Sequence, residues 1–272
     1  MKIWELTHNE IAEGIGDISW SDKEDILYYP YYLIYLKGFS KTSEQKEKIQ
    51  SIIAKLLKDI EEEWERFDIT YLPVVVRASQ MLHFANRTVR FSTSIWDKMK
   101  RKYYVDWLLS RRKSVPMSFI IQDMIYERNN GELDTQKDKY LNAELTEWVN
   151  QIKDYGMLKD PSSNRAEDIR RATILLEEKN AKNGIDVSEV LESISKQYLD
   201  IDYSKEDSAT LFNYIGFLMN IRIALNADFK DKYMDLYQAI ILHPNANRYL
   251  KETAKLLLAT IGTKDYFLVS FD

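Results

Sequence analysis

The chain has 272 residues, and its 38 Lys or Arg and 43 Asp or Glu give it a net charge of −5. Acidic and basic residues are spread evenly over both halves of the chain, which excludes a polyelectrolyte tail. It contains no cysteine, which excludes disulfides, thiolate metal sites and a cysteine nucleophile. Only 8 glycines and 5 prolines are present, less than half of average usage. Because strands and tight turns need such residues, the composition predicts an all-α fold of long helices joined by short loops.

Two capping-box patterns open the N-terminal helices, Ser21 with Glu24 and Thr42 with Gln45. After the second box, apolar residues recur with the i, i+3, i+4, i+7 spacing of an amphipathic helix of about six turns. These residues are Ile49, Ile52, Ile53, Leu56, Leu57, Ile60, Trp64 and Phe67.

Helices are also predicted from Pro73 toward His83, from Ser94 through Arg112, from Pro116 to near Gly131, and over 137–155. The stretch 156–164, with its Gly, Pro, Ser and Asn, is typical of a linker. It would divide the chain into helical lobes of residues 1–155 and 165–272, although one continuous domain is equally compatible with the pattern.

Three helix starts are predicted in the second half. Asn164 caps a helix that ends near Gly184, Asp186 with Glu189 forms a capping box, and Ser204 with Asp207 opens a further helix. The last of these is apolar on nearly every face over 211–225, which indicates a core helix, since polar residues interrupt it too often for a membrane span. Two more helices follow, divided by Pro244.

Residues 243–265 pass from a loop through Ala254–Leu258 to an Ile-Gly turn and Asp265. The C-terminal part of the chain that contains this stretch, about thirty residues, resembles a HEAT-type helical repeat. The resemblance implies a stack of helical hairpins and no particular activity. No second copy occurs at a period of about 40 residues.

The segment 87–113 carries nine basic residues and two acidic ones, with aromatic residues between them. Cations can neutralise phosphates and aromatic rings can stack on bases, so nucleic-acid binding is one interpretation, and binding an acidic protein is another. The alternative is an ordinary helix, whose buried stripe is Trp96, Met99, Tyr103 and Trp107 and whose cations are solvated. The candidate binding residues are Arg87, Arg90, Lys98, Arg101, Lys102, Arg111 and Arg112.

A tyrosine cluster at 28–35 is the second candidate surface, with Tyr28, Tyr31 and Tyr35 as candidate binding residues. Tyrosine is enriched at interfaces because one end is apolar and the other polar. Pro30 would occupy the first turn of a short helix. The alternative, which we favour, is a packed helix whose hydroxyl groups reach water.

No catalytic residue, cofactor site or metal site is predicted. Glu5 and His8 form a single Glu-x-x-His pair, whereas a di-iron bundle needs two such pairs and two more carboxylates. His83 and His243 lack a neighbouring ligand at helical spacing, and no phosphate-binding loop occurs. A remote alternative is an all-helical enzyme of the isoprenoid-synthase type, using the acidic run 59–63 to hold magnesium. The apolar C-terminal tail, 266–271, is expected to dock on the last helices or across a homodimer interface.

Together these patterns predict ten to twelve helices in antiparallel hairpins, arranged as a compact bundle or short irregular α-solenoid. The predicted function is a cytoplasmic protein-binding module, such as an adaptor, inhibitor or immunity-type protein, with nucleic-acid binding through 87–113 as the alternative. No targeting or membrane-spanning segment is recognised. Abundant Lys, Ile, Asn and Tyr suggest an AT-rich bacterial or phage genome.

Overall fold

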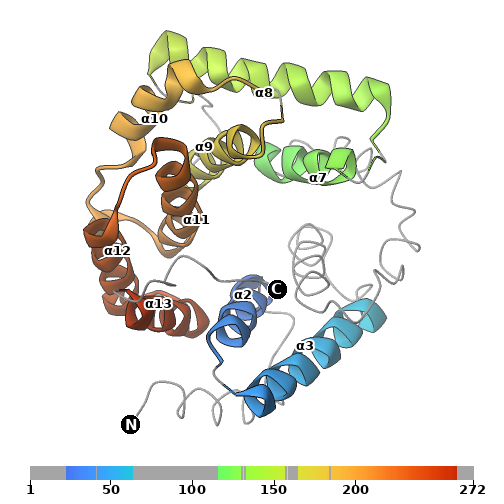
Figure 1. The fold of residues 1–272 in the computed structure, drawn as a ribbon, viewed down its shortest axis with the longest axis vertical. Helices are drawn as coiled ribbons and strands as arrows, with labels where there is room; N and C mark the ends of the chain where they lie inside the picture. Colours follow the sequence, from blue (N-terminus) through green and yellow to red (C-terminus); the bar gives the residue numbers. More distant parts are fainter. Residues whose placement is uncertain are drawn as a thin grey trace. The chain divides into compact units, whose positions relative to one another are not determined.

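A computed structural model of the chain describes residues 23–40, 42–63, 116–129, 133–156, 165–183 and 185–261, together with Gly131 and Leu158. These residues form nine α-helices and no strands, which confirms the predicted all-α fold and comes close to the predicted number of helices (Figure 1). The helices are α2 (Lys23–Phe39), α3 (Ser43–Glu63), α7 (Met117–Asn129), α8 (Thr135–Tyr155), α9 (Arg165–Asn180), α10 (Leu191–Tyr198), α11 (Ser208–Leu225), α12 (Lys230–Leu242) and α13 (Arg248–Thr260).

The chain divides into two compact units. The first combines Met1–Met99 with Ile240–Asp272, and the second is the continuous stretch Lys100–Ala239. The lobes predicted from the sequence, 1–155 and 165–272, place a boundary between α8 and α9, two helices that both belong to the second unit. That division stays a prediction.

In the first unit, α3 and α13 both pack against α2. The predicted stripe of α3 is buried at Ile49, Ile52, Ile53 and Leu56. The predicted capping box at the start of α3 is confirmed, since Gln45 N donates to Thr42 Oγ1 (3.2 Å) and Thr42 N donates to Gln45 Oε1 (3.4 Å).

The prediction that Pro30 lies in a first helical turn is wrong, because it lies inside the 17-residue helix α2. An interior proline removes one backbone hydrogen bond and costs about 3 kcal/mol. Apolar burial compensates for this cost, at about 1.5–3 kcal/mol for each large side chain. Tyr29, Tyr32, Leu33 and Leu36 are all at most 2 % exposed.

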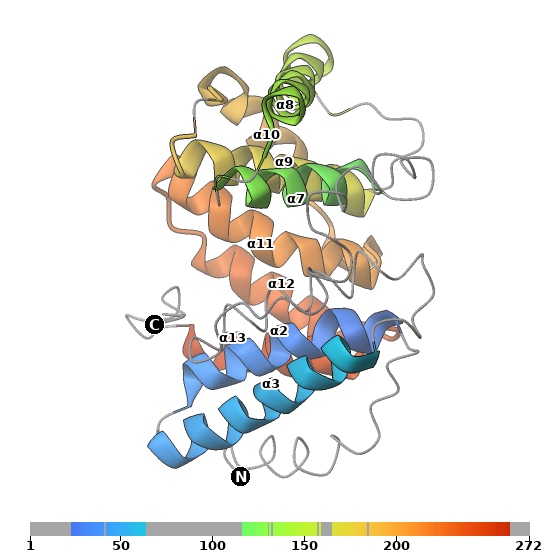
Figure 2. The ribbon, with the colours of Figure 1, turned by 90° about the vertical axis from the view of Figure 1, so that its right-hand side faces the viewer.

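In the second unit, α7, α9 and α11 form a row of parallel helices. Their direction follows from paired residues: Ser118 and Arg128, near the two ends of α7, contact Glu167 and Glu178 of α9. In the same way Asn213 and Asn220 of α11 contact Ala166 and Asn180 of α9. Helices α8 and α10 lie together outside the row, above α7 and α9 in both views (Figures 1 and 2).

Helix ends in the second unit follow local chemistry. Asp134 caps α8 by accepting from Lys137 N, and Gly156 ends the helix with a φ of 70° that favours glycine. The N-cap of α11 is Asp207, which accepts from Thr210 N (2.7 Å), so the cap lies three residues after Ser204, the predicted one. Ser204 instead lies in a separate 3-10 turn, held to Asp202.

Candidate functional site

The seven basic candidates, Arg87, Arg90, Lys98, Arg101, Lys102, Arg111 and Arg112, lie outside the described residues, as does the tail 266–271. Nucleic-acid binding through this segment and dimerisation through the tail therefore stay predictions.

The tyrosine candidates lie in α2, and two of the three are inside the first unit. Tyr28 is 3 % exposed and Tyr35 is 8 % exposed, whereas Tyr31 is partly exposed. Burial raises the pKa of Tyr35 well above its usual range. The neighbouring Tyr29 packs on Tyr249 of α13, with ring centroids 4.6 Å apart. The packing of these rings fits the packed-helix alternative, but the Tyr29 hydroxyl is buried and does not reach water as that alternative expects.

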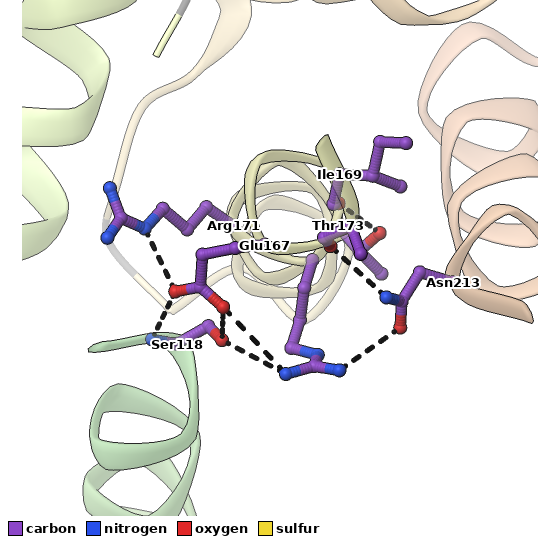
Figure 3. A network of polar contacts seen from close by, with 8 residues as sticks. Ser118, Glu167, Ile169, Arg171, Thr173 and Asn213 are labelled. Carbon is purple, nitrogen blue, oxygen red and sulfur yellow. Dashed lines mark hydrogen bonds and ion pairs between the residues drawn. The ribbon is translucent and has the colours of Figure 1, made fainter. Parts of the chain in front are cut away.

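A carboxylate that the sequence analysis did not single out organises one end of the α7–α9–α11 row. Glu167 lies in the first turn of α9 and is 7 % exposed. Its Oε1 accepts from Ser118 N (2.9 Å) and Arg171 Nε (3.2 Å), and its Oε2 accepts from Ser118 Oγ (2.5 Å). Figure 3 shows the carboxylate between Ser118 of α7 and Arg171 of its own helix.

This arrangement has a clear physical role. The first N–H groups of a helix lack partners within the helix, and the helix dipole makes that end attractive to a negative charge. Glu167 of α9 therefore caps α7 from outside it. The Arg171 guanidinium, 4 % exposed, balances the buried charge and lies over the Trp148 ring at 5.3 Å.

Arg170, which directly precedes Arg171, connects all three helices of the row. Its Cζ lies 4.1 Å from the centre of the Phe119 ring of α7, a cation–π contact. Its Nη1 lies 3.5 Å from Ser118 Oγ and 3.8 Å from Glu167 Oε2, and its Nη2 lies 3.5 Å from Asn213 Oδ1 of α11. Asn213 in turn donates to Ala166 O (3.1 Å). Unlike Arg171, Arg170 keeps 19 % of its side chain exposed.

A second polar cluster fixes the other end of the row. Arg128 of α7 forms an ion pair with Glu178 of α9, which is 2 % exposed and also accepts from Asn183 Nδ2 (3.1 Å). Asn180 Nδ2 donates to Asn220 O of α11 (3.1 Å). Because both ends of the row are tied by side chains, the three helices are held in a defined register.

Between these clusters, α11 carries a partly exposed apolar stripe. Phe212, Gly216, Met219 and Ile223 follow helical spacing and so lie on one side of α11. Ile223 is 60 % exposed, and the other three are partly exposed. Gly216 marks the edge next to α9, since a Cβ there would lie 3.7 Å from Thr173 Cγ2.

The stripe lies beside Asn213, the residue that Arg170 contacts. We call the surface formed by Phe119, Arg170, Asn213, Phe212, Met219 and Ile223 the row face. Its composition of aromatic residues, methionine and arginine is typical of the centre of protein interfaces. The neighbouring carboxylate of Glu167 is held by Ser118 and Arg171, an arrangement that suits a structural role.

The sequence contained a signal for part of this site. Glu167 precedes Arg170 and Arg171 by three and four residues, the spacing of ion pairs on one side of a helix. Many other pairs in this chain share that spacing. Nothing in the sequence shows which pair is buried against a second helix.

Among the described residues, no group of three or more His, Asp or Glu is placed to hold a metal ion. None of the described helices is both long and apolar enough to cross a membrane.

No family model, curated protein or solved structure matches this chain. The resemblance of residues 243–265 to a HEAT-type repeat therefore stays a prediction.

Proposed function

We propose that this chain is a cytoplasmic protein-binding module of the adaptor, inhibitor or immunity type, and that the row face is its binding surface. The observation that carries the proposal is the combination of the apolar stripe on α11 with the partly exposed Arg170 stacked over Phe119.

The row face has the properties of a binding surface. Large apolar side chains that are exposed or partly exposed beside an ordered arginine resemble the anchors that dominate binding energy at protein interfaces. The clusters around Glu167 and Glu178 hold α7, α9 and α11 in register before any partner arrives. A preformed surface loses little conformational freedom on binding, which favours affinity.

The test uses the full chain, immobilised and exposed to an extract of its source cells at high salt. The substitution Ile223→Lys places a positive charge in the apolar stripe. It should leave the fold intact, because Ile223 is already 60 % exposed and lies near the C-terminal end of α11, where the helix dipole favours a cation. The matched control Asn150→Lys adds the same charge to an exposed position on α8. Circular dichroism and thermal melting establish that both variants fold.

We expect a specific protein to be retained by the wild type and by Asn150→Lys, and retention to fall at least tenfold for Ile223→Lys. A tenfold loss corresponds to about 1.4 kcal/mol, within the range of an interface anchor. Equal retention by all three proteins would refute the row face as the binding surface. Failure of the wild type to retain any protein above the bare matrix would refute the protein-binding function.

The nucleic-acid alternative rests on the charge of the segment 87–113. It predicts that the wild type binds heparin and is eluted by salt, because phosphate contacts weaken steeply with ionic strength. A variant in which Lys98, Arg101 and Lys102 are replaced by Glu should elute at a lower salt concentration. Identical elution of the wild type and the triple variant would exclude this alternative.

A further inference from the structure

We draw no further inference here: the strongest candidate, the partly exposed Arg170 guanidinium beside the apolar stripe of α11, belongs to the row face already described, and nothing in the described residues shows the chemistry of what covers it.

Discussion

Removing the carboxylate of Glu167 tests whether one side chain holds the N-terminal end of the α7–α9–α11 row together. The substitution Glu167→Ala deletes the acceptor of Ser118 N, Ser118 Oγ and Arg171 Nε, in a region where Ser118 is fully buried and Arg171 is 4 % exposed. Breaking a buried ion pair by removing one partner costs about 3–5 kcal/mol, because the remaining charge loses its compensation.

We therefore expect Glu167→Ala to lower the free energy of unfolding of the second unit by about 3 kcal/mol. Glu167→Gln keeps an acceptor oxygen for Ser118 N but loses the charge opposite Arg171, so its effect should be smaller, about 1–2 kcal/mol. The matched control is Glu192→Ala. Glu192 also lies in the first turn of a helix, α10, but it is exposed, so its loss should cost less than about 1 kcal/mol.

Urea unfolding of the full chain, followed by circular dichroism, measures the effect. With a slope of about 3 kcal/mol per molar urea, a loss of 3 kcal/mol moves the midpoint by roughly 1 M. Hydrogen exchange of peptides from α7 and α9 locates the effect, which should be faster exchange at the start of α7. If Glu167→Ala and Glu192→Ala unfold at the same urea concentration, the proposed role of Glu167 is wrong.

Three substitutions should instead raise the melting temperature. Tyr29→Phe removes a hydroxyl that is buried without a hydrogen-bond partner, and Thr210→Val does the same at a fully buried position. Each substitution should stabilise the fold by about 1 kcal/mol, because an unpaired buried polar group is costly. Destabilisation by either substitution would mean that the hydroxyl it removes is hydrogen-bonded. Gly216→Ala should add about 1 kcal/mol through helix propensity, since the new Cβ lies 3.7 Å from Thr173 Cγ2, an ordinary contact distance. A lower melting temperature for Gly216→Ala would show that α9 and α11 pack more closely than described.

Local features of the fold could be predicted from the sequence where one short pattern specifies one structure. The Thr42–Gln45 box forms both of its reciprocal hydrogen bonds, and the stripe from Ile49 to Leu56 is buried as its spacing predicts. These outcomes depend on residues within a few turns of one another, so neighbouring sequence is sufficient to predict them.

Features that depend on distant residues could not be predicted in this way. Pro30 was expected near a helix start because local propensity disfavours it elsewhere, but packing of α2 against α3 and α13 outweighs that preference. Phe212, Met219 and Ile223 belong to a segment that is apolar all round, so the sequence alone did not distinguish the exposed side from the buried one. Glu167 was missed because Ser118, whose backbone N–H it accepts, lies 49 residues earlier in the chain.

The division of the chain also has a consequence for the order in which it folds during synthesis. The second unit is one continuous stretch, whereas the first needs α13 to pack on α2, and the contacting rings of Tyr29 and Tyr249 are 220 residues apart (249 minus 29). Contacts between distant residues form late because closing a long loop is entropically costly. The second unit can therefore fold on the growing chain, while the face of α2 that α13 covers stays exposed to chaperones and proteases until α13 has been synthesised.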